Sequence, residues 1–269
     1  MKQLAVIGVG NMAKAILGGM ARAALPVSRV ILFDPNIEQY KMLPEAPFEY
    51  SYAKSITEAV AKADTVLLSV KPQQYPEVLA EIAKVENATQ KLYISIGAGI
   101  TVAAITDVLF GARVVRVLPN VPMLIGMGVS VICRNDAVAA SDFDDVCRIF
   151  ETAGSTILID ESEMNRMIGV TSSSPAYVFQ FIRAMYDGAI AQGLTDSPEL
   201  LSAICDTIIG SATMLKQSTD TPNGLIAKVA SKGGTTEQAL LRLKDGNLDA
   251  TIAEAMKACT ARADELGRR

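Results

Sequence analysis

The 269-residue chain contains no histidine and no tryptophan, and only 5% of its residues are aromatic. Without an imidazole side chain, Ser-His-Asp hydrolysis, Cys-His proteolysis and histidine-ligated zinc are all excluded. The histidine acid/base of many alcohol and hydroxy-acid dehydrogenases is excluded for the same reason. The chain must therefore perform its chemistry without an imidazole proton relay, and we expect no metal site.

Cysteines and clusters of basic residues are also scarce. The four cysteines lack any C-x-x-C pair, which argues against a zinc knuckle or a disulfide framework and favours reduced thiols in the cytosol: Cys133, Cys147, Cys205 and Cys259. The net charge of -4, without a Lys/Arg-rich block, argues against nucleic acid or an anionic membrane as the partner. No signal-peptide pattern or membrane-length apolar stretch is present. We therefore expect a soluble, unprocessed cytoplasmic protein that binds a small molecule.

Apolar residues make up 50% of the chain and are arranged in two successive patterns. Up to about residue 160, short β-branched runs alternate with helical periods, which predicts an α/β Rossmann-type parallel sheet wrapped by helices over 1–160. The remainder, 161–269, shows only helical periods. These helices carry apolar residues on more than one face, so we expect this all-α domain to pack against a second copy in a homodimer or a higher oligomer of dimers.

The predicted elements have clear boundaries. The predicted strands span 4–9, 29–33, 65–70, 92–97, 114–118, 129–133 and 155–159. The predicted helices of the second domain span about 161–192, 198–217, 222–231, 235–243 and 247–266.

A glycine-rich turn follows the first predicted strand and opens a helix, in the segment VIGVGNMAKAILGGM at 6–20. Its G-x-G-x-x-A pattern is typical of dinucleotide binding, because the glycines allow a tight turn and close approach of a pyrophosphate. The alternative is a strand-to-helix turn without a ligand. The predicted cofactor-binding residues of this turn are Gly8, Gly10, Asn11, Met12 and Ala13.

An acidic residue, Asp34, ends the second predicted strand. At this position a carboxylate binds the adenosine ribose hydroxyls of the cofactor and repels a 2′-phosphate, which favours NADH over NADPH. The alternative is that Asp34, Pro35 and Asn36 form an ordinary turn.

The later strands also end in residues suited to ligand binding, because ligands of open α/β sheets bind at the carboxyl ends of strands. Lys71 has the alternative of being an ordinary solvated loop lysine. The predicted cofactor-binding residues at these ends are Val70, Lys71, Pro72, Ala98, Gly99 and Asn120.

A second glycine pair lies far from these strands, in SKGGTTEQ at 231–238. Gly233 and Gly234 permit backbone angles forbidden to other residues, and Thr235 with Gln238 resembles a capping box that opens a helix. The unsatisfied amides of such a helix start hold an anion well. The alternative is an ordinary loop that enters an ordinary helix.

Five motifs together resemble the pyrroline-5-carboxylate reductase family, over nearly the whole chain. They are GVGNMA at 8–13, SVKPQ at 69–73, RVLPNVP at 116–122, SSSPAYVF at 172–179 and SKGGTTEQAL at 231–240. The resemblance implies reduction of the cyclic imine 1-pyrroline-5-carboxylate to proline with NAD(P)H. It also implies that the loop at 231–236 binds the substrate carboxylate.

Individual roles follow from the same resemblance. The Thr236 hydroxyl faces the ring nitrogen and is the predicted catalytic group. A protonated imine is already electrophilic, so this modest help suits a site without histidine. The predicted substrate-binding residues are Ser174, Ser231, Gly233, Gly234, Thr235 and Thr236.

The chain departs from the family pattern at several positions. Ser172 and Ser174 replace two glycines, which leaves room for a related imine substrate or for a catalytically weak NAD-binding regulatory paralogue. Pro35, Asn36 and Ile56 replace residues that often accompany NADPH, and these changes favour NADH.

Overall fold

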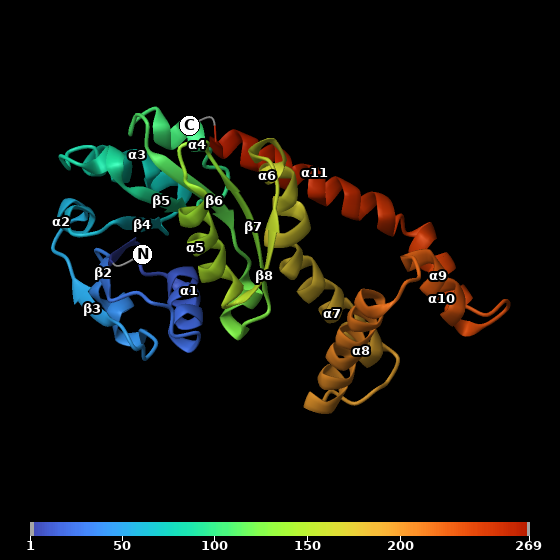
Figure 1. Cartoon of the computed structure of the whole chain (residues 1–269). Helices are drawn as coiled ribbons and strands as arrows, with labels where there is room; N and C mark the ends of the chain where they lie inside the picture. Colours follow the sequence, from blue (N-terminus) through green and yellow to red (C-terminus); the bar gives the residue numbers. More distant parts are fainter. Residues whose placement is uncertain (1–2, 268–269) are drawn as a thin grey trace. The chain divides into compact units, whose positions relative to one another are not determined.

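The computed structural model describes residues 3–267 (Figure 1). Met1 and Lys2 of the first predicted domain, and Arg268 and Arg269 of the second, lie outside the described residues. The strands are β1 (Gln3–Ile7), β2 (Arg29–Phe33), β3 (Glu49–Tyr52), β4 (Thr65–Leu68), β5 (Leu92–Ser95), β6 (Arg113–Leu118), β7 (Gly128–Arg134) and β8 (Gly154–Leu158). The α-helices are α1 (Asn11–Arg22), α2 (Ile56–Ala61), α3 (Tyr75–Ile82), α4 (Val102–Thr106), α5 (Ala140–Glu151), α6 (Glu161–Met167), α7 (Ser174–Ala191), α8 (Pro198–Gln217), α9 (Pro222–Val229), α10 (Thr235–Asp245) and α11 (Leu248–Gly267). The 3₁₀ helices are η1 (Ile37–Met42), η2 (Pro72–Gln74), η3 (Ala88–Gln90) and η4 (Val121–Ile125), and η5 (Ile168–Ser172) is a π-helix.

The central sheet is buried on both faces, as its apolar strands predict. In β1, Leu4 and Val6 belong to the core that contains α1 and α5. The alternate residues, Ala5 and Ile7, belong to a second core that contains α2, α3 and α4. Because successive side chains of a strand point to opposite faces, helices cover both sides of the sheet (Figure 1). The predicted Rossmann-type layering is confirmed.

The sheet has the order β3-β2-β1-β4-β5-β6-β7-β8. All neighbouring strands are parallel except β6 and β7, which are antiparallel. The connection between these two strands contains only η4 and short turns, whereas a parallel return needs a crossover of a dozen or more residues. The strand β3 was not predicted, because this short edge strand is half-exposed and carries no apolar run.

The predicted helix at 161–192 is wrong as a single element. It is divided into α6, η5 and α7, and the amide of Ser173 donates to the carbonyl of Ile168 at 2.8 Å, five residues earlier. Gly169 lies within this turn, where a β-carbon would be 3.2 Å from the Cα of Met256 on α11. The π-helical turn thus lies against α11, and π-turns of this kind often mark functional sites.

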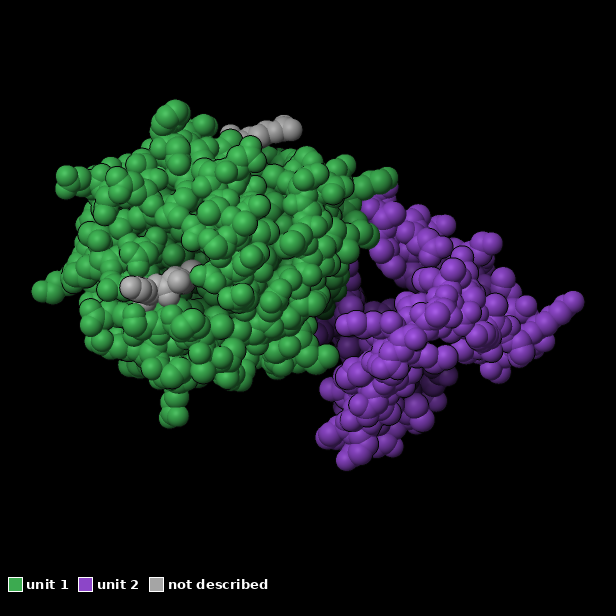
Figure 2. Space-filling view, viewed as in Figure 1, with its two compact units in different colours: residues 1–175, 256–269 green, residues 176–255 purple. Residues whose placement is uncertain are grey.

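Two compact units divide the chain, one of residues 1–175 with 256–269 and one of residues 176–255 (Figure 2). In the first unit, Met164 and Ile168 pack with Ala263 of α11 against Leu118 and Val131 of the sheet. The predicted boundary after residue 160 stays a prediction. No helix within residues 3–267 is long and apolar enough to cross a membrane.

Candidate active site

The glycine-rich turn has the geometry that its sequence predicts. Gly8 has a φ of +89°, and a β-carbon there would lie 2.7 Å from the carbonyl oxygen of Ser69. Only glycine therefore lets this turn pass so close to the end of β4. Gly10, by contrast, has open space where its β-carbon would be, with no atom within 4 Å. Ala13 is fully buried, as close packing of helix and strand requires.

The start of α1 presents uncapped backbone amides beside this open space. Gly10 is the N-cap residue and provides no side-chain cap. The amides of Asn11 and Met12 have no hydrogen-bond partner among the described residues, and they point along the positive end of the helix dipole. The uncapped amides and the cradle at Gly10 both fit the pyrophosphate of a dinucleotide.

Asp34 follows β2 and reaches into the same turn. Its Oδ2 accepts a hydrogen bond from the amide of Val9 at 2.8 Å, and its Oδ1 accepts from the amide of Asn36 at 2.8 Å. The hydroxyl of Tyr40 accepts from the Asp34 amide at 2.7 Å and lies 3.0 Å from the Asp34 carbonyl oxygen, to which it donates. Burial raises the pKa of Tyr40, so its hydroxyl stays protonated and able to donate.

A buried tyrosine joins the ends of β4 and β5. The Tyr75 hydroxyl accepts from the amide of Gly97 at 3.0 Å and lies 3.0 Å from the Leu68 carbonyl oxygen and 2.9 Å from Ser95 Oγ. Burial raises the pKa of Tyr75 to about 12. Gly97 must be small, because a β-carbon there would be 2.7 Å from the Tyr75 ring. Tyr75 was not predicted as part of the site, because no pattern in the neighbouring sequence indicates that its hydroxyl contacts both strand ends.

The residues just beyond these two strands stay predicted cofactor ligands. Val70 lies against Gly8, since a β-carbon on that glycine would be 2.9 Å from Val70 Cγ1. Lys71 is exposed and precedes Pro72 at the start of η2. After β5, Ala98 packs at the edge of the core beneath α11. Gly99 has a φ of +79°, and a β-carbon at this position would lie 2.6 Å from a carbonyl oxygen of α11.

The side chains of Asn120 and Ser174 both donate hydrogen bonds to the carbonyl oxygen of Thr171. The buried Asn120 side chain donates to the Thr171 carbonyl oxygen at 3.0 Å and accepts from the Val129 amide at 2.8 Å. Ser174 Oγ donates to the same Thr171 oxygen at 3.4 Å. The neighbouring Ser172 hydroxyl is buried without a hydrogen-bond partner among the described residues. These contacts attach the π-helical turn to the end of β6, and the predicted ligand roles of Asn120 and Ser174 stay predictions.

The structure of the loop at 231–234 differs from two predictions made from its sequence. The capping box of Thr235 and Gln238 is wrong, because Gly234 is the N-cap and Thr235 is the first helical residue of α10. The left-handed backbone lies at Gly233, with φ +73°, whereas Gly234 has φ -83°. Glu237 provides the contact that the box would have made, since its Oε2 accepts from the Gly233 amide at 2.7 Å.

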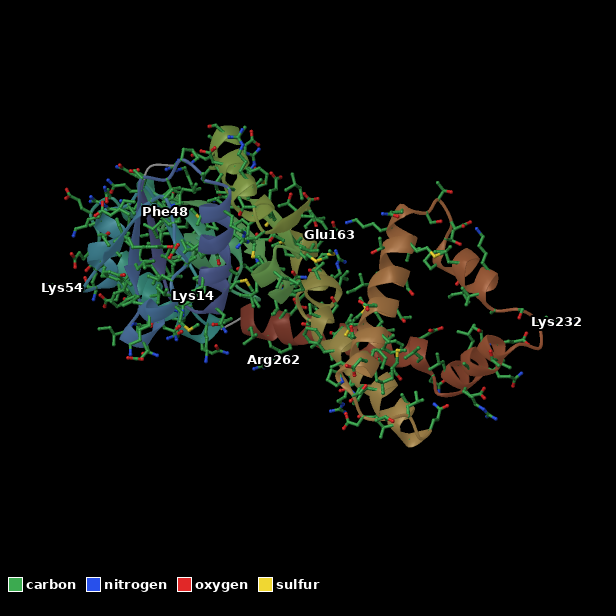
Figure 3. The ribbon with its side chains drawn as sticks, turned by 90° about the horizontal axis from the view of Figure 1, so that it is seen from below. Lys14, Phe48, Lys54, Glu163, Lys232 and Arg262 are labelled. Carbon is green, nitrogen blue, oxygen red and sulfur yellow. The ribbon has the colours of Figure 1, made fainter. Side chains whose placement is uncertain are left out.

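Backbone amides remain available at this helix start. The Gly234 amide donates to the Ser231 carbonyl oxygen at 3.0 Å, so it is already used within the turn. The amides of Thr235 and Thr236 have no partner among the described residues. The Thr236 side chain is half-buried, whereas Thr235 is exposed. Lys232, in the same loop, is also exposed (Figure 3). The arrangement can hold a carboxylate at the two amides with a hydroxyl beside it.

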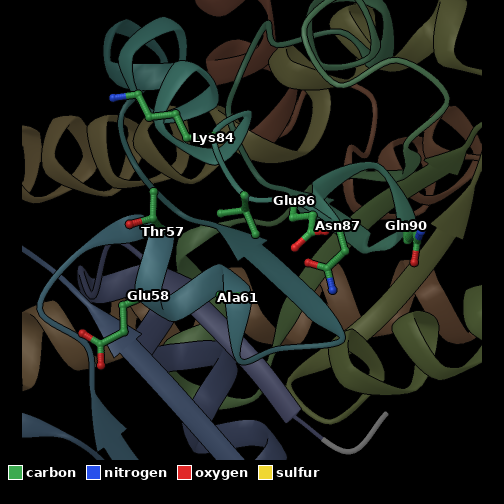
Figure 4. Close-up of a pocket in the computed structure, with 8 residues that line it drawn as sticks. Thr57, Glu58, Ala61, Lys84, Glu86, Asn87 and Gln90 are labelled. Atoms are coloured by element: carbon green, nitrogen blue, oxygen red, sulfur yellow. The ribbon is translucent and has the colours of Figure 1, made fainter.

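A groove of about 830 Å³ lies elsewhere in the first unit, between α2 and the turn after α3 (Figure 4). Its residues include Thr57 and Glu58 of α2, and Lys84 and Gln90 from the segment that leads into β5. These segments precede β4 and β5, so the groove is at the amino ends of the strands, opposite the glycine turn. Within residues 3–267 no group of three or more acidic or cysteine side chains is placed to hold a metal ion.

Known proteins match the chain over its full length. Residues 161–266 match the family model described as pyrroline-5-carboxylate reductase dimerisation, and residues 3–99 match one described as NADP oxidoreductase, coenzyme F420-dependent. Pyrroline-5-carboxylate reductase of Escherichia coli is 33% identical over 269 residues, with 99% of each chain covered. The Vibrio alginolyticus enzyme is 35% identical, with 98% of this chain and 97% of the other covered.

This chain belongs to the pyrroline-5-carboxylate reductase family. Two solved structures agree with that membership. Plasmodium falciparum pyrroline carboxylate reductase with NADP bound has a TM-score of 0.87 at 25% identity, covering 99% of this chain and 98% of the other. The Streptococcus pyogenes enzyme has a TM-score of 0.87 at 27% identity, covering 98% of both chains. The family identified from the five motifs is confirmed, and with it the prediction of an oxidoreductase with a Rossmann domain and a helical second domain.

Proposed function

We propose that this reductase converts 1-pyrroline-5-carboxylate to L-proline with NAD(P)H, and that the start of α10 holds the substrate carboxylate. The observation that carries the substrate assignment is the pair of unpartnered amides at Thr235 and Thr236, on the loop whose sequence resembles the family's carboxylate-binding loop. Full-length membership of the family supports the reaction.

Each part of the site has a separate task in this proposal. The Thr235 and Thr236 amides bind the carboxylate and orient the ring. The Thr236 hydroxyl hydrogen-bonds at the ring nitrogen, which helps keep that nitrogen protonated and the neighbouring carbon electrophilic. NAD(P)H, when bound, supplies the hydride that turns the C=N group into an amine. The cradle at Gly10 and the amides that follow it would hold the pyrophosphate.

Replacing Thr236 with alanine should lower kcat/KM about 10- to 100-fold, the effect of losing a hydrogen bond to a charged group. Thr235→Ala is the matched control. It keeps its amide, and its side chain makes no capping bond, so its kinetics should stay close to those of the parent. Steady-state rates with both variants test the assignment. Equal losses in the two variants would remove Thr236 from its catalytic role.

We further propose that NADH is the preferred cofactor, because the Asp34 carboxylate lies at the glycine turn through its bond to Val9. A negative charge here repels a 2′-phosphate. A chain with Asp34→Ser and Pro35→Arg should shift preference toward NADPH, because repulsion is removed and a phosphate partner is added. The check is kcat/KM with each cofactor, and a parent enzyme that already favours NADPH would contradict the role given to Asp34.

We also propose a homodimer formed through the helical unit. Within the described residues 176–255, Ile204 is the one buried side chain. Large apolar side chains are instead exposed along these helices, including Phe179, Phe181, Ile209, Met214, Ile226, Val229, Leu241 and Ile252. A unit that buries so little alone needs a partner to cover it. A cytoplasmic location is part of the same proposal, supported by thiols that suit a reducing compartment.

Light scattering should give twice the mass of one chain, and the thermal midpoint should rise with protein concentration, because association stabilises the folded state. A charged residue in place of Phe179 should weaken both effects. A monomeric parent with a concentration-independent midpoint would contradict the dimer.

A further inference from the structure

Every polar group of Asp34 is engaged in a hydrogen bond. Its two carboxylate oxygens accept from the amides of Val9 and Asn36, each at 2.8 Å. Its own amide and carbonyl oxygen are both bonded to the hydroxyl of Tyr40, at 2.7 and 3.0 Å. Tyr40 thus holds the Asp34 backbone at both its amide and its carbonyl group.

The segment that carries Tyr40 is itself fixed. Asn36 caps η1 by accepting from the Glu38 amide at 3.1 Å. Lys14 of α1 (Figure 3) donates from Nζ to Gln39 Oε1 at 3.0 Å, which attaches η1 to the helix that follows the glycine turn. The Tyr40 ring also packs at 4.8 Å, between ring centroids, against the ring of Tyr52 at the end of β3. Tyr40 therefore reaches Asp34 from a segment anchored on two sides.

This arrangement decides how Asp34 responds to a 2′-phosphate. A mobile carboxylate can rotate away from an approaching phosphate and so tolerate NADPH. A carboxylate held at its oxygens, with its backbone held as well, keeps its charge in place.

We propose that Tyr40 is a positioning residue that determines cofactor specificity, by holding Asp34 so that NADPH is rejected. This inference rests on the proposed preference for NADH. Tyr40 acts through Asp34 and needs no contact of its own with the cofactor. No local pattern marks it in the sequence, since the contact depends on the turn that η1 makes.

The test measures dissociation constants of NADH and NADPH by fluorescence titration, without turnover. Tyr40→Phe removes both hydrogen bonds to the Asp34 backbone. It should lower the ratio of the NADPH constant to the NADH constant about 5- to 10-fold, the scale of a typical net hydrogen-bond contribution. Tyr52→Phe is the matched control, because the Tyr52 hydroxyl has no hydrogen-bond partner among the described residues, and its ratio should equal that of the parent. In an Asp34→Ser background, Tyr40→Phe should leave the ratio unchanged, because its effect passes through Asp34.

The outcomes that would overturn the proposal are distinct. If the parent prefers NADH but Tyr40→Phe keeps the parent ratio, the role of Tyr40 is overturned and the role of Asp34 stands. The role of Tyr40 is likewise overturned if Tyr40→Phe changes the ratio equally with and without Asp34. If the parent binds NADPH more tightly than NADH, the proposed preference itself fails, and the role of Tyr40 fails with it. General destabilisation would lower the thermal midpoint but would not change the ratio of two constants measured on the same folded protein.

Discussion

Replacing Gly10 with valine is expected to raise the NADH dissociation constant about 100-fold, equivalent to about 2.7 kcal/mol, while the fold is retained. Gly10 has φ -75° and ψ -175°, an extended conformation that any residue adopts, and its β-carbon would meet no atom within 4 Å. An added β-carbon therefore brings no strain and no clash within the chain. It fills the space in which a pyrophosphate would approach the backbone.

A graded series separates this effect from general damage. Gly10→Ala fills less of the space and should weaken NADH binding less than Gly10→Val. Gly8→Val should behave differently, because it combines φ +89° with a β-carbon 2.7 Å from the Ser69 oxygen, and so should destabilise the fold itself. Fluorescence titration with thermal unfolding distinguishes the two. Parent-like NADH binding by a folded Gly10→Val variant would remove the glycine turn from the cofactor site.

Replacing Gly234 with valine is expected to raise the KM for the imine about 30- to 100-fold, with NADH affinity unchanged, on the scale of one or two lost charge-assisted hydrogen bonds. The cause is crowding, since φ at Gly234 is -83° and suits any residue. A β-carbon would lie 2.6 Å from Ser231 Oγ and 3.0 Å from the Ser231 carbonyl oxygen. Ser231 would have to move, and the turn that presents the Thr235 and Thr236 amides would move with it.

The neighbouring glycine is the matched control. Gly233→Ala introduces strain of about 1–2 kcal/mol, because φ is +73°, but its β-carbon would meet no atom within 4 Å. It should lower the free energy of unfolding more than it raises the imine KM. Steady-state kinetics beside denaturant unfolding separates the two variants. An unchanged imine KM in Gly234→Val would mean that the loop is only the entrance to α10.

Local patterns predicted the parts of this protein that depend on local chemistry. The apolar run of β1 and the glycines after it required a buried strand and a tight turn, and both are present. The predicted capping box at Thr235 is wrong because the same segment can begin the helix with a different N-cap residue, Gly234. With Gly234 as the N-cap, the Glu237 side chain reaches back to the loop and the Thr235 hydroxyl is not needed.

The structural features that were not predicted from the sequence depend on contacts between residues far apart in the chain. The Tyr75 hydroxyl joins two strand ends, and Tyr40 reaches back to Asp34 across η1. Nothing in the residues beside these tyrosines specifies such a contact. The predicted helix at 161–192 is likewise divided where α11 lies against Gly169, a contact that only the folded chain brings about. Tertiary packing therefore decides those positions.

The most direct measurement mixes the purified protein with NADH and 1-pyrroline-5-carboxylate and follows the loss of NADH absorbance, with other cyclic imines assayed beside it. The proposed function predicts rapid, protein-dependent NADH oxidation, fastest with 1-pyrroline-5-carboxylate and accompanied by an equal amount of proline. Faster oxidation with a different imine would reassign the substrate, in keeping with the serines at 172 and 174. NADH binding without acceleration by any imine would contradict the proposed catalysis and identify a nucleotide-binding protein that has lost it.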